Sequence, residues 1–155
     1  MTPVCIMMIG IAGSSKSTLA QKIYNHVKES NIDIRIFSSD EIRARIYGDA
    51  NCQDNPKRVF EILHNEMIAH LRNGGYAIYD ATNLRADRRK EIIARIRREC
   101  PTCIIVGHIA QITAEEAIAR QELRERKVPA EVIRRQLAQL QLPTADEGFD
   151  WVSGV

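Results

Sequence analysis

One nine-residue segment combines glycines, small polar residues and a single lysine in a spacing that can bind phosphate. It reads Gly10-Ile11-Ala12-Gly13-Ser14-Ser15-Lys16-Ser17-Thr18. In phosphate-binding loops the backbone N–H groups surround the phosphates of a nucleotide, the lysine reaches the β and γ oxygens, and the next hydroxyl holds magnesium. We therefore expect this segment, apart from Ile11, to bind ATP, with Lys16 on the phosphates and Ser17 on Mg²⁺.

One position of this loop departs from the strict pattern. Glycine normally precedes the lysine, whereas Ser15 does so here, and a side chain at this point can narrow the loop or restrict its backbone angles. A simple Gly/Ser turn between a strand and a helix is the alternative interpretation. It does not explain Lys16 at a helix start, where a cation opposes the helix dipole unless an anion lies nearby.

Two carboxylates follow expected strands, Asp40 after residues 33–37 and Asp80 after residues 76–79. Ligands bind beyond the carboxyl ends of parallel strands, and phosphoryl transfer to a hydroxyl needs a base or positioning carboxylate together with cations. Arg43 lies three residues after Asp40 on the same side of a helix, so this pair can supply a base and an anchor for an acceptor phosphate. A helix-starting Asp40 beside a surface arginine is an equal alternative. Asp80 can position Arg43, assist magnesium through water or cap a helix.

Arg120 and Arg124 are four residues apart, so they share one face of a helix that we expect over residues 113–126. Pro129 then opens another helix. Arginines beside an abrupt junction of two helices favour a mobile lid, over about residues 113–140, that closes on the triphosphate. The alternative is a solvated helix in which neighbouring glutamates pair with the arginines.

The elements that must position these residues alternate between strands and helices. The continuous apolar run over residues 4–9 is typical of a parallel strand buried on both faces. Alternation of this kind predicts an α/β fold with a parallel sheet of four to five strands and helices on both faces. The expected strands are 4–9, 33–37, 76–79, 103–109 and 149–153, and the expected helices are 16–28, 40–47, 57–72, 86–99, 113–126 and 129–140.

Composition narrows the class of protein. The chain has 155 residues, 45% hydrophobic and 27% charged, which argues against disorder or a fibrous repeat and favours one domain. The apolar run is far shorter than the roughly 20 residues of a membrane span, so we expect a cytoplasmic protein with no membrane partner. Residues 85–136 carry 13 basic and eight acidic groups, a surplus that is rich in arginine and agrees with phosphate-bearing partners.

Four motifs span nearly the whole chain: Gly10-x-x-Gly13-x-x-Lys16-Ser17-Thr18, Ser39-Asp40-x-x-Arg43, Asp80-x-Thr82-Asn83, and Arg120-x3-Arg124 before Val128-Pro129. In this combination, and with the tail Glu147-Gly148-Phe149-Asp150, they resemble the kinase module of polynucleotide 5′-kinases. The individual motifs are shared with related P-loop kinases of small molecules. The resemblance implies a single P-loop kinase domain over residues 1–155, with a P-loop NTPase-type sheet and a helical arginine lid.

On the nucleotide side, the resemblance implies that Lys16 and the loop amides hold the phosphates of ATP and that Ser17 ligates Mg²⁺. Arg120 and Arg124 form the lid clamp. Lys16 and Arg124 are accordingly expected to be catalytic, with Asp40 as the third catalytic residue.

On the acceptor side, the resemblance implies that Asp40 is the general base for the 5′-hydroxyl end of DNA or RNA. Arg43 binds the neighbouring acceptor phosphate, Asp80 orients Arg43, and Asn83 belongs to the same substrate site. Two alternatives stay open. One is a kinase of a small alcohol such as a nucleoside, sugar or antibiotic, and the other is a nucleotide-binding module without transfer activity, in which Ser15 marks degeneration.

Overall fold

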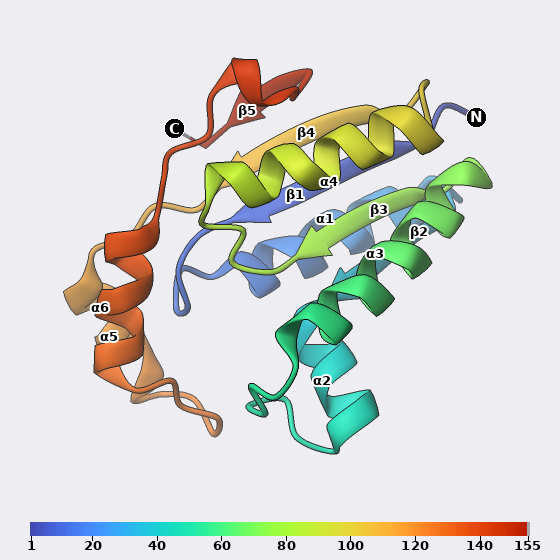
Figure 1. Ribbon diagram of the computed structural model, residues 1–155. Coiled ribbons are helices and arrows are strands. Elements are labelled where there is room, and N and C mark those ends of the chain that lie inside the picture. The colour runs from blue at the N-terminus through green and yellow to red at the C-terminus, as the bar shows by residue number, and fades with distance from the viewer. Residues whose placement is uncertain (155) are drawn as a thin grey trace.

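The computed structural model describes residues 1–154 and contains the predicted parallel sheet, with five strands in the order β2-β3-β1-β4-β5 (Figure 1). All four strand pairings are parallel. The strands are β1 (Val4–Ile9), β2 (Ile34–Ser38), β3 (Tyr76–Asp80), β4 (Ile104–Ile109) and β5 (Trp151–Ser153). The predicted α/β class is therefore confirmed.

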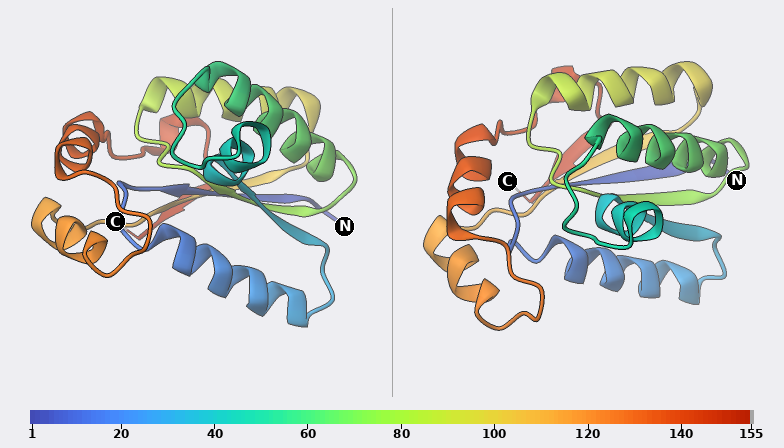
Figure 2. Two further views of the ribbon diagram at one scale, coloured as in Figure 1. Left: turned by 90° about the horizontal axis from the view of Figure 1, so that it is seen from below. Right: turned by 60° about the horizontal axis from the view of Figure 1, so that its bottom comes forward.

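Helices cover both faces of the sheet, with α1 on one face and α3 and α4 on the other (Figure 2). The central strand β1 shows why: Cys5 and Met7 pack toward α3 and α4, Met8 packs toward α1, and all three are fully buried. The helices are α1 (Lys16–Glu29), α2 (Ser39–Tyr47), α3 (Pro56–Arg72), α4 (Ala86–Glu99), α5 (Ala114–Gln121) and α6 (Ala130–Gln139), followed by the 3₁₀ helix Ala145–Glu147.

Helices α5 and α6 stand beside the carboxyl ends of the strands rather than over a face of the sheet (Figure 1). A small apolar cluster of Ile11, Leu84, Ala117 and Ile133 joins them to the loops that follow β1 and β3. The pair therefore lies where ligands bind in an open parallel sheet.

The end of α5 corrects one prediction. The helix expected over residues 113–126 stops at Gln121, and the next three amides, from Glu122 to Arg124, donate to carbonyls three residues back. The Gln121 side chain then accepts a hydrogen bond from the Val128 amide at 3.0 Å, which closes the segment into a turn. Arg120 and Arg124 consequently do not share a helix face, because Arg124 lies beyond the last helical residue.

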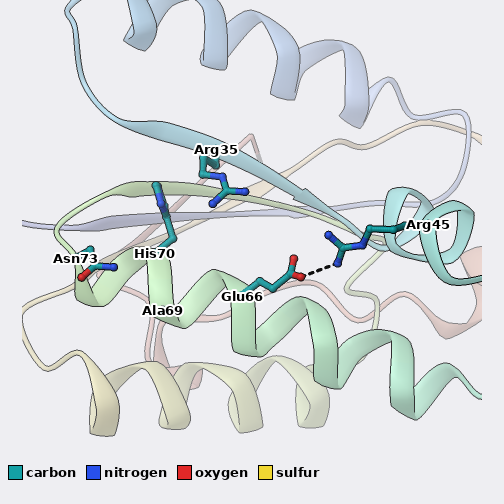
Figure 3. Close-up of a pocket in the computed structure, with 6 residues that line it drawn as sticks. All are labelled: Arg35, Arg45, Glu66, Ala69, His70 and Asn73. Carbon is teal, nitrogen blue, oxygen red and sulfur yellow. Dashed lines mark hydrogen bonds and ion pairs between the residues drawn. The ribbon is translucent and has the colours of Figure 1, made fainter.

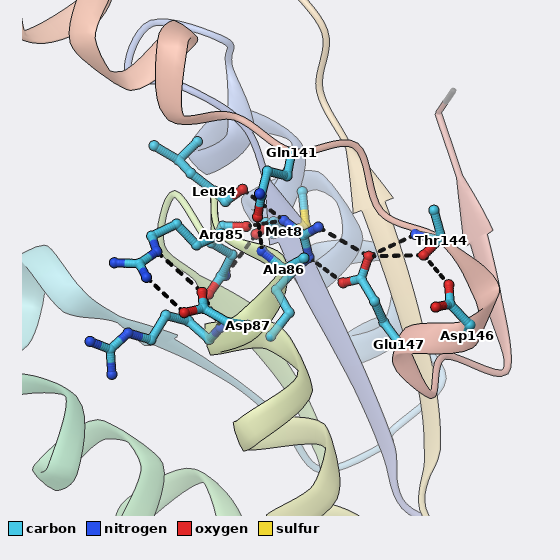
Figure 4. A network of polar contacts seen from close by, with 12 residues as sticks. Met8, Leu84, Arg85, Ala86, Asp87, Gln141, Thr144, Asp146 and Glu147 are labelled. Atoms are coloured by element: carbon cyan, nitrogen blue, oxygen red, sulfur yellow. Dashed lines mark hydrogen bonds and ion pairs between the residues drawn. The ribbon is translucent and has the colours of Figure 1, made fainter.

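A buried ion pair joins α4 to the C-terminal segment. Arg89 is fully buried and donates to both carboxylate oxygens of Glu147, at 2.6 and 3.1 Å. The Arg89 Nη1 also donates to the carbonyls of Asn83 and Leu84, while Glu147 accepts from the Thr144 amide at 2.8 Å (Figure 4). The network thus fixes the loop that follows β3, one of the loops at the carboxyl edge.

Removing the charge of Glu147 is expected to destabilise the chain. Glu147→Gln leaves the Arg89 guanidinium buried without a counter-charge, and breaking such a pair costs about 3 kcal/mol or more of unfolding free energy. Urea denaturation measures this loss. The matched control is Glu91→Gln, whose carboxylate pairs with Arg88 at 3.6 Å on the surface and is expected to change stability by less than about 1 kcal/mol. Equal stabilities of the two variants would contradict the prediction.

Among residues 1–154, no helix is both long and apolar enough to cross a bilayer.

Candidate active site

A cleft of about 1220 Å³ opens between the carboxyl edge of the sheet and the α5–α6 pair. Six segments line it: the phosphate loop, the start of α2, the connection from α2 into α3, the end of β3 with the loop after it, the end of α5 with the turn that follows, and α6. The predicted site residues that it brings together are Ala12, Gly13, Ser15, Lys16, Ser17, Thr18, Asp40, Arg43, Asp80, Arg120 and Arg124. Gly10, Ser14 and Asn83 do not line it.

The phosphate loop packs directly against helix α5. Gly13 has a φ of 82°, and a Cβ at this position would lie 2.8 Å from the Ala117 carbonyl oxygen and 2.8 Å from the Gln121 side-chain nitrogen. Only glycine satisfies both the left-handed backbone and this close approach. The phosphate loop and helix α5 are therefore in direct contact.

Ser15 adopts the conformation that explains the usual glycine at its position. Its φ is 67°, in the left-handed region, and it serves as the N-cap of α1 without a side-chain capping bond. Its hydroxyl instead accepts a hydrogen bond from Nη1 of Arg120, which also donates to the Gly13 carbonyl at 3.1 Å. Serine in place of the usual glycine therefore keeps the loop geometry, but it leaves the backbone at this position strained.

Replacing this serine with glycine is expected to stabilise the chain. Ser15→Gly relieves a left-handed conformation that costs roughly 1–2 kcal/mol for a residue with a Cβ, partly offset by the greater freedom of glycine in the unfolded chain. We expect a net gain of about 1 kcal/mol in unfolding free energy, measured by denaturant titration. Ser30→Gly is the control, since Ser30 is exposed, has an ordinary φ of −83° and gains nothing from glycine. A Ser15→Gly variant less stable than the parent would contradict the strain argument.

Lys16 is held under the loop at the floor of the cleft. It is 8% exposed, and its ammonium donates to the Ile11 carbonyl at 3.0 Å. Burial lowers the pKa of Lys16, while the carboxylates of Asp80 and Asp40 oppose that shift. A buried cation beneath a loop of backbone N–H groups is well placed to hold a polyphosphate.

Ser17 and Asp80 form the adjoining pair, because the Ser17 hydroxyl donates to Asp80 Oδ2 at 2.9 Å. Burial raises the pKa of Asp80, and the Ser17 hydrogen bond and the charge of Lys16 oppose the rise. A hydroxyl and a carboxylate side by side next to a phosphate loop supply the hard oxygen donors that Mg²⁺ prefers. These residues fit the ion: Ser17 would hold it with Asp80 beside it, and the bound ion would offset phosphate charge.

Asp40 and Arg43 face the cleft from the start of α2. Arg43 donates from Nη1 to Asp40 Oδ1 at 3.2 Å, is 8% exposed, and stacks over the Phe60 ring at 5.8 Å. The expectation that Asp80 orients Arg43 is therefore corrected: Asp40 contacts the guanidinium, and Asp80 contacts Ser17. The Nε of Arg43 is buried and has no hydrogen-bond partner among the described residues.

The structure also places Asn83 differently from the expectation that it belongs to the substrate site. It has a φ of 48°, and its side-chain amide donates to the Met8 carbonyl at 2.8 Å. This bond ties the loop after β3 to the end of β1 and turns the amide away from the cleft. We assign Asn83 a structural role at the sheet edge in place of a substrate contact.

Two polar side chains that the sequence analysis missed close the cleft. Arg126 donates to Asp40 Oδ2 at 3.0 Å and to the Asn51 side chain at 2.6 Å, and Gln136 of α6 accepts from the Ala12 amide at 2.8 Å. Arg126 could have been found from the sequence, because it belongs to the same arginine-rich run as Arg120 and Arg124. Nothing in the sequence points to Gln136, because its hydrogen-bond partner lies 124 residues away.

A second, smaller hollow of about 370 Å³ lies between β2 and α3 (Figure 3). The Arg45–Glu66 ion pair, at 2.6 Å, spans part of it. Its other lining residues are Arg35, Ala69, His70 and Asn73. None of the predicted site residues belongs to it, so the large cleft is the candidate active site.

A phosphate loop after the first strand of a parallel sheet, with a hydroxyl–carboxylate pair beside it and an acid–arginine pair across the cleft, defines a P-loop kinase domain. The chain belongs to the AAA domain family, whose model matches residues 5–143.

The similar proteins include kinases of different kinds. The chain is 22% identical to 6-phosphofructo-2-kinase 1 of Saccharomyces cerevisiae over 136 residues, which cover 77% of this chain and 16% of the yeast protein. A chain in the Pnkp1/Rnl/Hen1 complex matches with a TM-score of 0.64 and 22% identity, over 77% of this chain and 39% of that one. Kti12 of Chaetomium thermophilum, in complex with ADP-AlF3, matches with a TM-score of 0.71 and 15% identity, over 96% and 87%. At these identities the solved structures show the fold alone.

Proposed function

We propose that this chain is an ATP-dependent kinase that transfers the γ-phosphate to the 5′-hydroxyl end of DNA or RNA. The proposal rests on the motif resemblance and on the way the cleft divides. The phosphate loop with Lys16 follows β1, whereas the Asp40–Arg43 pair follows β2, and β3 lies between these two strands in the sheet. This division separates a donor subsite from an acceptor subsite, as in-line transfer requires.

In the proposed reaction, Asp40 takes the proton of the 5′-hydroxyl while its oxygen attacks the γ-phosphorus. The bond from that phosphorus to the β–γ bridging oxygen breaks, and ADP leaves with the electron pair. Lys16 and Arg124 stabilise the charge on the transferring phosphoryl group, and Arg120 holds the triphosphate. Each of these residues lines the cleft.

One observation carries the acceptor assignment. Arg43 is nearly buried, its Nη1 is held by Asp40, and its Nε has no partner among residues 1–154. A buried donor without a partner is costly, and an anionic group on the acceptor would satisfy the guanidinium. The phosphate next to a 5′-terminal nucleoside is such a group, and it lies near the hydroxyl that Asp40 would deprotonate.

The basic surplus in residues 85–136 supports a polymeric acceptor, because a nucleic acid needs phosphate contacts beyond the catalytic pair. Arg85, Lys127 and Arg135 from this region line the same cleft. The likeness to a 6-phosphofructo-2-kinase favours a second candidate: a small phosphorylated alcohol, whose phosphate would occupy the place of the polynucleotide phosphate on Arg43.

A single assay separates the two candidates. The protein is incubated with γ-labelled ATP, Mg²⁺ and a 5′-hydroxyl oligonucleotide, beside the same oligonucleotide already 5′-phosphorylated. Label on the first oligonucleotide and not on the second is the expected result. No label on either, with ATP still bound, would exclude the polynucleotide acceptor and direct the search to small alcohols.

A further inference from the structure

Arg126 joins the two walls of the cleft at its mouth. It lies in the turn between α5 and α6, whereas its partners lie across the opening: Asp40 at the start of α2, and Asn51 in the segment between α2 and α3. Figure 1 shows this turn reaching toward that segment. The contacts span 86 and 75 residues of chain. No other hydrogen bond among residues 1–154 links the turn to these two segments.

The contact occupies the side chain proposed as the base. Asp40 Oδ1 receives Nη1 of Arg43 at 3.2 Å, and Oδ2 receives Nη1 of Arg126 at 3.0 Å. Arg43 is nearly buried and fixed, so Oδ2 is the oxygen that an incoming hydroxyl can reach. Arg126 stands at that oxygen.

Arg126 is also able to leave. Its side chain is 32% exposed and that of Asp40 is 47% exposed, so this pair lies on the rim and exchanges partners without disturbing the core. Arg43, with a side chain 10% exposed, has no such freedom. The two arginines that donate to Asp40 therefore differ. Arg43 is buried and fixed, whereas Arg126 is partly exposed and can leave the carboxylate.

We propose that Arg126 is a specificity-determining residue that keeps water from using Asp40 until a proper acceptor displaces it. The proposal rests on the proposed role of Asp40 as the base. Displacing Arg126 breaks its contact with Asp40. An acceptor compensates for this loss because it also binds Arg43 and other residues of the cleft, whereas a water molecule makes no such contacts. Arg126 thereby discriminates an alcohol acceptor from water.

The suppressed reaction is the hydrolysis of bound ATP. A water oxygen would attack the γ-phosphorus as Asp40 took a proton from that water, and the bond from the phosphorus to the β–γ bridging oxygen would break. The products are ADP, inorganic phosphate and a proton. With Arg126 on Oδ2, the water has no free carboxylate oxygen on the cleft side to accept its proton.

The test measures ADP formation from ATP and Mg²⁺ without any acceptor. Arg126→Ala is expected to raise hydrolysis about tenfold, since a freed general base can contribute roughly 10²–10⁴ in rate. Arg134→Ala is the matched control: it removes an arginine of the same lid, whose pair with Glu115, at 3.7 Å, lies on the surface, and it should hydrolyse ATP at the parent rate. The double variant Arg126→Ala/Asp40→Asn should lose the rise, which shows that Arg126 acts through Asp40.

Hydrolysis by Arg126→Ala at the parent rate overturns the proposal, and hydrolysis below the parent rate also overturns it and would make Arg126 a phosphate clamp instead. A rise that persists in the double variant also overturns it, because a loosened lid would then explain the effect. None of these readouts uses an acceptor, so failure of the oligonucleotide assay is distinguishable. That failure removes the polynucleotide and leaves the control of hydrolysis standing.

Discussion

Lys16→Ala is expected to lower the rate of phosphoryl transfer by about 10³-fold, because a preorganised donor to the transferring phosphoryl group contributes this much when water is excluded. Lys16 is the cation that the phosphate loop holds at the cleft floor, with its ammonium on the Ile11 carbonyl at 3.0 Å. A nucleotide phosphate is a better partner than that carbonyl. The ammonium is therefore free to move onto the phosphate without rebuilding the loop.

The same substitution is expected to leave the fold intact. Burial lowers the pKa of Lys16, which means that the folded chain holds this ammonium at a cost, and alanine removes that cost. Thermal unfolding checks stability, and initial rates with γ-labelled ATP check turnover. Lys22→Ala is the matched control, since Lys22 is an exposed lysine of the same helix. Parent-like turnover by Lys16→Ala would remove the phosphate-loop assignment.

Local patterns predicted the fold and the floor of the site well, because their causes are local. The apolar run over residues 4–9 must be a strand buried on both faces, and the loop after it joins that strand to α1 within a few residues. Asp40 and Arg43 are three apart on one helix, so their contact follows from helical geometry. In each case the residues that form the pattern and the residues that they contact lie in the same element or in two adjacent ones.

Contacts between distant segments escaped prediction. The motif resemblance places Asn83 in the substrate site, yet its hydrogen-bond partner is the Met8 carbonyl, 75 residues away. Residue spacing does not encode such a bond. The predicted end of α5 was wrong for a related reason. The Gln121 side chain turns back to the Val128 amide, although the residues between them are ordinary helix formers.

The segment that joins α5 to α6 shows how these distant contacts bear on chemistry. Arg120 reaches the phosphate loop at Ser15 and Gly13, and Arg126 reaches the acceptor side at Asp40. The last turn of α5 and the turn that follows it therefore contact both halves of the cleft. Because Arg124 lies between them in sequence and lines the cleft, closing this segment on a nucleotide would also move the group beside Asp40.

Asp40→Asn is expected to lower kcat by about 10²–10⁴-fold, the usual contribution of a positioned base, while changing ATP affinity little. The amide keeps the size of the carboxylate and can still accept from Arg43, so the acceptor subsite keeps its shape. It cannot take the hydroxyl proton. The side-chain hydrogen bonds of Asp40 go to Arg43 and Arg126 and not to the phosphate loop, which is why nucleotide binding should survive.

Calorimetric titration with a non-hydrolysable ATP analogue and initial rates of transfer separate these two quantities. Glu41→Gln is the matched control: it makes the same kind of change at the next residue of α2, where the side chain is exposed, and it should keep both affinity and rate. A loss of nucleotide binding in Asp40→Asn would refute the base role, because a base acts on the barrier rather than on ground-state binding. A fall in kcat with affinity retained would place Asp40 at the proton of the acceptor, and the control of that carboxylate by Arg126 would then follow as the next step of the mechanism.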